Sequence, residues 1–295
     1  MNKVYLYVVL TAFCFGTLEI SGKIAGNNVD AFQLTFWRFL IGSLCLLPIA
    51  ITEFKRIKPN VTKKDVSLVV LAGIVCVPIS LLICQLGIER CNASTASVIL
   101  ATNGMFTMVF AHFIANEKFT AQKAKLLFVA IVGLIFLICP WNMKEGNTFL
   151  GVTLMLIGAI TFALYVVMGK IIGQKIGSIV QACSCMFIGS IILLIIILIM
   201  DKPIFEGLWD NIIVVLYAGV VVTCGGYLFL FLAIRNSNAS TGAIAFFLKI
   251  VIAPLLSVII LKETLEWNSY VGISLVLLSS FLNLKLAKKP IDKLS

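Results

Sequence analysis

Ten long apolar segments, joined by short polar stretches, are the feature that most restricts how this chain can fold. Hydrophobic residues make up 61% of its 295 residues and charged residues 12%, against about 45–50% and about 25% in soluble domains. About 20 apolar residues in a helix cross a bilayer, and only helices or closed barrels satisfy their backbone there. The segments are long and do not alternate in polarity, so they predict an all-α integral membrane protein.

The first predicted span occupies the place of a signal peptide, but its apolar stretch is too long for a signal core and contains Glu19. We therefore count it as a transmembrane helix. The ten predicted transmembrane helices cover residues 4–25, 31–51, 66–87, 93–115, 124–140, 149–172, 177–200, 211–234, 240–261 and 267–286.

The chain contains an internal duplication. Asn92-Ala93-Ser94-Thr95 recurs 146 positions later as Asn238-Ala239-Ser240-Thr241, and each copy precedes an apolar run that ends in a glutamate, Glu117 or Glu263. A period of that length indicates a duplicated membrane half. We expect residues 1–146 and 147–295 to form two repeats of five helices. Further matches, offset by 146 or 147 positions, are Gly22-Lys23-Ile24 with Gly169-Lys170-Ile171, Ile41-Gly42-Ser43 with Ile188-Gly189-Ser190, and Ala72-Gly73 with Ala218-Gly219.

Basic residues predict the orientation of the helices. Five of them, Lys23, Arg90, Lys144, Lys202 and Lys262, fall on one side of the predicted membrane and sixteen on the other. The positive-inside rule then puts both termini in the cytoplasm of a multi-pass protein of the cell (inner or plasma) membrane. Because five helices per repeat is an odd number, the two repeats must be inverted relative to each other. The sixteen are Lys3, Lys55, Arg56, Lys58, Lys63, Lys64, Lys118, Lys123, Lys125, Lys170, Lys175, Arg235, Lys285, Lys288, Lys289 and Lys293.

Inverted repeats are typical of secondary transporters, whose substrate site lies between the halves near the membrane midplane. The short loops leave no room for a catalytic or nucleotide-binding domain, and no phosphate-binding loop motif is present. The net charge of +10 follows from topology and does not indicate nucleic-acid binding, and the nine cysteines lack metal-type spacing. We expect no enzyme, cofactor or metal; the expected partners are the bilayer, a small-molecule substrate and, with coupling, protons. A facilitative pore is the remote alternative, and a monomer or a homodimer fits equally.

Several motifs make the chain resemble the drug/metabolite transporter superfamily, in its EamA-like branch of ten-helix carriers. They are Phe15-Gly16, Arg38-Phe39, the spans that end at Glu117 and Glu263, and Pro254 followed by Lys262-Glu263-Thr264-Leu265 and Gly272. The first repeat departs from the pattern, with Met108 where the second has Pro254. The resemblance implies a carrier of small metabolites, often an exporter of amino acids, amines or toxic compounds.

Glu19 is the first candidate for substrate binding or proton coupling, because an ionisable group inside a span costs roughly 2.5–3.5 kcal/mol on insertion scales. Ala12, Gly16, Glu19 and Lys23 lie on one narrow arc of the first helix, which lets a helix or a substrate approach closely. Burial favours the protonated carboxyl, which suits exchange of a proton for a cationic substrate. The alternative is a structural ion pair with Arg38.

Lys249 lies almost at the midplane of the ninth span, and its repeat equivalent is Asn103. Pseudo-symmetric positions that face a common cavity are where an inverted repeat builds its site. Lys249 would bind a substrate carboxylate or neutralise Glu19; the alternative is a lysine that extends to the membrane interface. Arg38 follows Trp37, and a structural or gating role is favoured over substrate contact.

Tyr165 and Tyr227 are candidate cavity residues, because aromatic faces hold amines and quaternary ammonium groups, although a membrane tyrosine is more often packing.

His112, the only histidine, is expected to be an inert interfacial residue. Asn92 begins a match to the glycosylation pattern, but its place before an apolar run predicts a helix N-cap. Glu263 is expected to orient the following connection.

The resulting hypothesis is a secondary active transporter that works by alternating access, with bending of helices at Pro78, Gly225, Gly226 and Pro254. An amino acid would satisfy both an acid and a lysine, so amino-acid or related metabolite export is the first substrate hypothesis. Choline-like compounds, other amines and drug cations are the alternative.

Overall fold

A computed structural model describes residues 3–26, 28–116, 120–138, 146–235 and 239–287. Every regular element in these ranges is helical, which confirms the all-α prediction. Nine described stretches are long and apolar enough to cross a membrane, and the tenth span has a shorter apolar stretch, Trp267–Leu282. The spans are, in order, α1–α2 (Lys3–Gly16, Leu18–Ala25), α3 (Ala31–Ile57), α4–η1–α5 (Lys63–Ile74, Val75–Leu81, Leu82–Ile88), α6–α7 (Ala93–Ala101, Asn103–Ala115), α8 (Ala121–Ile138), α9 (Phe149–Ile176), α10 (Ser178–Ile199), α11–η2–α12 (Ile212–Leu216, Tyr217–Gly225, Gly226–Arg235), α13 (Ala239–Leu261) and α14 (Trp267–Ala287).

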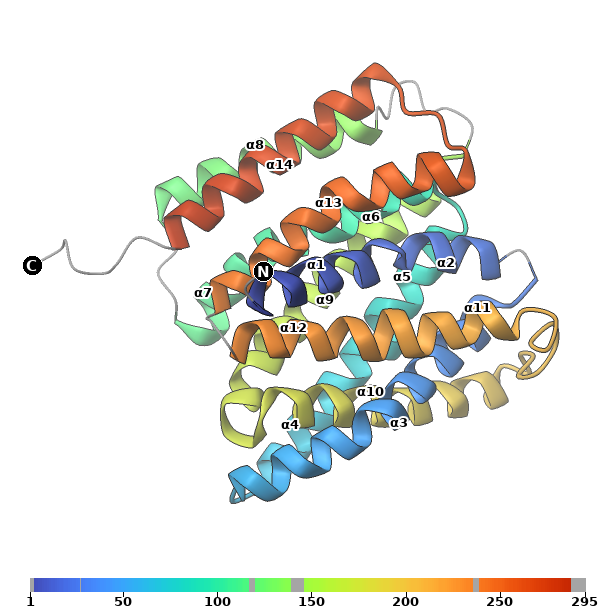
Figure 1. Ribbon diagram of the computed structural model, residues 1–295, viewed down its shortest axis with the longest axis vertical. Helices are drawn as coiled ribbons and strands as arrows, with labels where there is room; N and C mark the ends of the chain where they lie inside the picture. The colour runs from blue at the N-terminus through green and yellow to red at the C-terminus, as the bar shows by residue number, and fades with distance from the viewer. Residues whose placement is uncertain (1–2, 27, 117–119, 139–145, 236–238, 288–295) are drawn as a thin grey trace, which may run out of the picture.

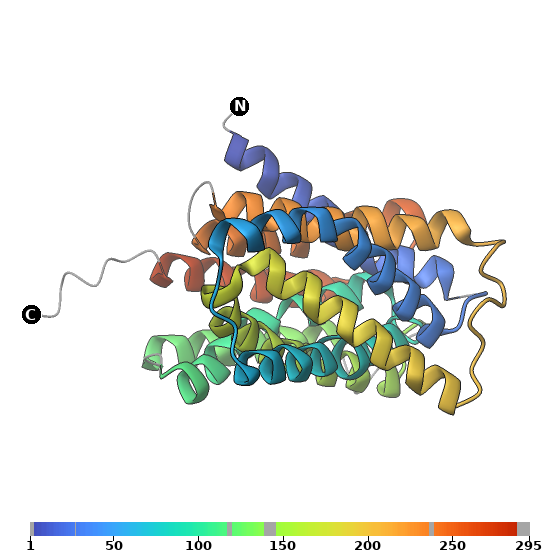
Figure 2. The same cartoon turned by 90° about the horizontal axis from the view of Figure 1, so that it is seen from below.

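The helices run roughly along one direction and form a single bundle (Figure 1). Helix α1 begins and α14 ends at the same end of the bundle, as an even number of crossings requires (Figures 1 and 2). We call the opposite end, where α3 and α6 begin, the far end. Helices α8 and α14 lie side by side at one edge of the bundle (Figure 1).

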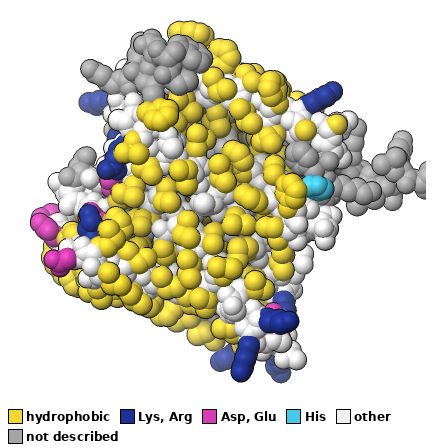
Figure 3. Space-filling view, turned by 180° about the vertical axis from the view of Figure 1, so that it is seen from behind, with side chains coloured by type: hydrophobic (Ala, Val, Ile, Leu, Met, Phe, Trp, Pro, Cys, Tyr) yellow, Lys and Arg dark blue, Asp and Glu magenta, His cyan; other side chains and the backbone are white. Residues whose placement is uncertain are grey.

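The surface of the bundle is apolar. The face in Figure 3 is hydrophobic over most of its area, with charged side chains gathered at its edges. Large apolar side chains on several helices point outward, among them Ile199, Ile213 and Phe113, which are 79%, 80% and 75% exposed. Exposed apolar area of this extent is unfavourable in water but matches a lipid environment.

Two pairs of glycines from the duplicated motifs join the halves in equivalent contacts. A Cβ atom at Gly189 of α10 would lie 2.6 Å from the carbonyl oxygen of Gly73 of α4. A Cβ atom at Gly42 of α3 would lie 3.2 Å from the carbonyl oxygen of Gly219 in η2. Gly42 and Gly189 are repeat equivalents, as are Gly73 and Gly219. Only glycine permits such close approach of helix backbones.

Four spans are interrupted near their middles. Pro78 lies in the π-helical segment η1, and Gly225 ends the π-helical segment η2, with Gly226 opening α12. Thr17 separates α1 from α2, and Thr102 separates α6 from α7. Local hydrogen bonds favour the last two breaks, because the Thr17 and Thr102 hydroxyls donate to backbone carbonyls three residues earlier, at 3.0 and 2.6 Å.

Pro254, unlike Pro78, lies in a helix that continues through it. Helix α13 runs without interruption through Pro254, so the structure assigns no local break to this proline. The two π-helical segments, by contrast, occupy equivalent parts of the third and eighth spans.

Candidate functional site

The centre of the candidate site is an ion pair between the first and ninth spans. The Lys249 Nζ atom lies 2.6 Å from Glu19 Oε1, and the two side chains are 3% and 1% exposed. The second carboxylate oxygen, Glu19 Oε2, is buried and has no hydrogen-bond partner among the described residues. The partner of Glu19 is therefore Lys249 and not Arg38, and half of the carboxylate remains available to another donor.

Small residues on both helices bring the pair together. Gly16 of α1 faces α13, and a Cβ atom there would lie 3.1 Å from Ile252 Cγ2 and 3.7 Å from the Ala253 backbone nitrogen. Glu19 follows Gly16 by three residues, and Lys249 precedes Ala253 by four, so both charges lie on the same contact face. The predicted small-residue arc of the first helix thus packs against α13.

Arg38 lies in α3, and this helix packs against η1, α5 and η2 as well as against α10. Its side chain is 4% exposed, and its Nε atom has no hydrogen-bond partner among the described residues. Its Cζ atom lies 4.4 Å from the centroid of the Phe39 ring, a cation–π contact. Tyr227, Cys84, Glu19 and Cys76 lie near enough to interact with it electrostatically. Arg38 is thus close to the Glu19–Lys249 pair without forming an ion pair within the described chain.

Tyr227, in α12, packs against the first helix. Its ring contacts Phe15 edge-on, with centroids 5.3 Å apart. Phe15 precedes Glu19 by four residues, so this aromatic pair lies in the same part of the first span as the carboxylate. Gly226 makes room for it, because a Cβ atom there would lie 2.5 Å from the Phe15 ring.

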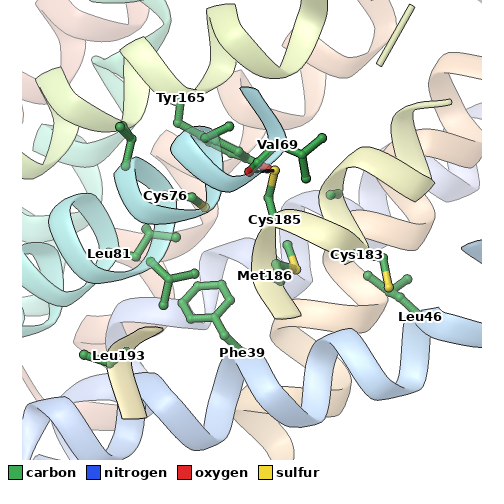
Figure 4. Close-up of a cluster of buried hydrophobic side chains, with 14 of the residues drawn as sticks. Phe39, Leu46, Val69, Cys76, Leu81, Tyr165, Cys183, Cys185, Met186 and Leu193 are labelled. Atoms are coloured by element: carbon green, nitrogen blue, oxygen red, sulfur yellow. Dashed lines mark hydrogen bonds between the residues drawn. The ribbon is translucent and has the colours of Figure 1, made fainter. Parts of the chain in front are cut away.

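Tyr165 belongs to a different environment. It is 4% exposed and packs in a hydrophobic cluster of α3, η1, α9 and α10, close to Cys76 and Cys185 (Figure 4). The Gln181 amide donates to its hydroxyl at 3.4 Å. Figure 4 also shows Phe39, the residue after Arg38, in this cluster.

Asn103 is the first residue of α7 and directly follows the break at Thr102. Its side chain is 7% exposed. Gly104, next to it, borders open space, since no atom lies within 4 Å of a Cβ atom placed there. His112, farther along α7, is exposed, and its ring centroid lies 5.2 Å from that of Phe113.

At the far end, the carboxylate of Glu263, which the sequence predicts to orient the following connection, also binds the start of α6. Glu263 follows α13 and accepts hydrogen bonds from the backbone nitrogens of Ala93 and Ser94, at 2.6 and 3.1 Å, and from the Ser94 hydroxyl at 2.7 Å. Asn92 occupies the N-cap position of α6, as predicted, but its own side chain forms no capping bond. The Glu263 carboxylate, from the second half of the chain, takes the place of an Asn92 cap. Nearby, Lys23 donates a hydrogen bond to the Cys91 carbonyl.

Glu89 also lies at the far end, just beyond α5. Burial raises the pKa of its carboxyl to about 7, with Asp30 adding to the rise and Arg90 and Lys202 opposing it. Its Oε2 atom is 3.6 Å from Arg90 Nη1, while Oε1 is buried without a partner among the described residues.

Metal binding finds no support in the described residues, where no group of three or more His, Cys, Asp or Glu side chains could hold an ion. The described cysteines are free thiols, and most of them are buried. Glu117, Asn238 and the basic residues Lys118, Lys144, Lys288, Lys289 and Lys293 lie outside the described residues.

Comparisons with known proteins agree with this architecture. The model of the EamA-like transporter family matches residues 2–139 and 149–285. An uncharacterized transporter of Clostridium kluyveri is 34% identical over 299 residues, covering 99% of this chain and 96% of the relative. The S-adenosylmethionine uptake transporter of Rickettsia prowazekii is 26% identical over 153 residues, 52% of this chain and 49% of that one. A solved crystal structure with 14% identity matches 98% of this chain and 99% of its own with a TM-score of 0.66, which shows a common fold.

Proposed function

Because this chain belongs to the EamA-like transporter family, we propose that it carries small zwitterionic metabolites, amino acids first, across the cell membrane by alternating access. The observation that carries this proposal is the buried ion pair between Glu19 and Lys249. Ionisable groups at such depth are expensive and mark substrate or ion pathways. A zwitterion presents an ammonium and a carboxylate, which compete for an acid and a base of the same cluster.

Exchange of partners would link binding to movement. A substrate ammonium donates to the free Glu19 Oε2 atom, or a proton neutralises the carboxylate, and either event weakens the bond that joins α1–α2 to α13. The interruptions at Thr17 and Thr102 and in η1 and η2 lie in the spans around this pair and provide places for helices to bend. The energy available is the differential affinity of the substrate for the two states.

The orientation belongs to the same proposal. With sixteen basic residues assigned to the side of the termini and five to the other, both termini would lie in the cytoplasm. The S-adenosylmethionine carried by the Rickettsia relative itself contains an α-amino acid group, which supports a substrate of that chemistry. Export is our proposed direction.

Amines and quaternary ammonium compounds are a second candidate, favoured by the Phe15–Tyr227 pair beside Glu19. Aromatic faces next to a carboxylate attract organic cations. Such a substrate would need Glu19 but not a cationic side chain, so the two candidates differ in their dependence on Lys249.

The test uses the full chain purified in detergent and reconstituted in liposomes. Thermal unfolding is measured with the proteinogenic amino acids, their decarboxylated amines and choline at pH 6 and pH 8, because a ligand that binds only the folded protein raises the midpoint. Ligands that raise it are then tested for saturable counterflow. Loss of amino-acid stabilisation in both Glu19→Gln and Lys249→Ala supports the zwitterion. Amine binding that needs Glu19 alone supports the second candidate, and non-saturating flux would identify a pore.

The control is Glu206→Gln, which removes an exposed carboxylate in the connection between α10 and α11. It should bind and transport as the unchanged protein does. Uptake with an imposed pH gradient, with and without a protonophore, tests the coupling ion; an unchanged rate would contradict coupling to protons.

A further inference from the structure

The buried charges of the described chain do not balance. Three charged side chains are buried, Glu19, Lys249 and Arg38. The first two form an ion pair, which leaves the guanidinium of Arg38 as an uncompensated positive charge. A buried charge without a partner is strongly unfavourable in an apolar medium, so a fold that keeps one requires a compensating group.

The described residues around Arg38 provide no such group. Its Nε atom is buried and has no hydrogen-bond partner among the described residues. The Phe39 ring at 4.4 Å gives a cation–π contact, which is weaker than the cost of an unpaired buried charge. Glu19 interacts electrostatically with Arg38, but it already binds Lys249.

A second unsatisfied polar group lies on the same face of α3. The Thr35 hydroxyl is buried and has no hydrogen-bond partner in the part of the chain that the structure describes, and it lies one turn before Arg38. Other hydroxyls of this helix behave differently, since Ser43 donates to the Leu40 carbonyl at 2.8 Å and Thr52 donates to the Pro48 carbonyl at 2.9 Å. The Thr35 donor is therefore free for a partner beside the guanidinium.

Guanidinium and hydroxyl donors on one helix face suit a planar anion, and a carboxylate accepts two parallel hydrogen bonds from arginine. We propose that Arg38, assisted by Thr35, binds the carboxylate of the transported metabolite and thereby sets the specificity of the carrier for carboxylate-bearing substrates. This inference rests on the proposed function and deepens it. The substrate ammonium then takes the free oxygen of Glu19, which weakens the bond between its other oxygen and Lys249.

The experiment measures affinity by thermal shift and counterflow for three compounds. They are the amino acid with the largest effect in the panel, its carboxamide and its decarboxylated amine. In Arg38→Gln the affinity for the amino acid should fall at least tenfold, which corresponds to about 1.4 kcal/mol. Affinities for the carboxamide and the amine should stay within about twofold, because neither carries the carboxylate.

Two further variants keep the test decisive if Arg38→Gln does not fold. Arg38→Lys keeps the charge but loses the planar pair of donors, and Thr35→Val removes only the hydroxyl. Each should weaken amino-acid binding several-fold and leave the amine unaffected. Equal losses for all three compounds, or no loss in any variant, would overturn the proposal and leave Arg38 a structural residue.

The proposed function and the role of Arg38 fail in different ways. If no amino acid stabilises or exchanges on the unchanged protein, the proposed function is wrong. If amino acids bind and exchange but the Arg38 and Thr35 variants discriminate among the three compounds as the unchanged protein does, only the role of Arg38 is wrong.

Discussion

Gly189 of the second half lies against Gly73 of the first, so closely that a Cβ atom at Gly189 would come within 2.6 Å of the Gly73 carbonyl oxygen. The equivalent pair, Gly42 with Gly219, makes the corresponding contact elsewhere in the bundle. Two of the short motifs that recur in the sequence thus lie where the halves touch. Close backbone approach through small residues is a main source of helix association in membranes.

The first prediction concerns this contact. Gly189→Ala should lower the thermal midpoint, because the added methyl group meets backbone in the adjacent helix, and overpacking costs about 1–3 kcal/mol. The matched control is Gly104→Ala, where the Cβ atom meets no atom within 4 Å. That change should be neutral or slightly stabilising, since alanine favours helix. Equal effects of the two substitutions would contradict the proposed contact.

The second prediction concerns the ion pair. Glu19→Gln and Lys249→Met should each destabilise the protein by roughly 3–5 kcal/mol, because each leaves a buried charge without its partner. The double variant should lose much less than the sum of the single losses. Chemical unfolding of all four proteins gives the coupling. Strictly additive losses would show that the two side chains do not interact in the folded protein.

The third prediction concerns the far end. Glu263→Gln should lower stability by about 1–3 kcal/mol, since a carboxylate that accepts three hydrogen bonds at the start of α6 is replaced by a group that also carries donors. Ser94→Ala removes one of these bonds and should cost less. Glu206→Gln, in an exposed position, serves as the control. If Glu263→Gln and Glu206→Gln unfold alike, Glu263 does not hold α6.

The fourth prediction concerns pH. Burial raises the pKa of Glu89 from 4.5 to about 7, so the folded protein holds this proton more tightly than the unfolded chain does. The associated stability is fully present below about pH 4.5 and is lost as the pH rises through about 7. Midpoints measured from pH 4.5 to 8 should therefore decline, and Glu89→Gln should reduce the decline. A Glu89→Gln profile that follows the unchanged protein at every pH would refute this assignment.

Much of the architecture follows from sequence because its causes are local or periodic. The length and apolarity of each run determine that it is a helix long enough to cross a bilayer, and the ten predicted helices agree with those observed. Pro78 and Gly225 indicated the irregular third and eighth spans, since both weaken an α-helix. Thr17 and Thr102 gave a weaker signal, because a threonine inside a helix more often leaves the helix intact.

Which residue pairs with Glu19 depended on the tertiary structure. The class of the fold, the repeated motifs and the three ionisable residues inside the spans follow from the sequence alone. The sequence left open whether Glu19 would pair with Arg38 or Lys249, because depth along a helix does not say which helices touch. Because α1 packs against α13 through Gly16, Glu19 pairs with Lys249. As a result, Arg38 has no ion-pair partner in the described chain.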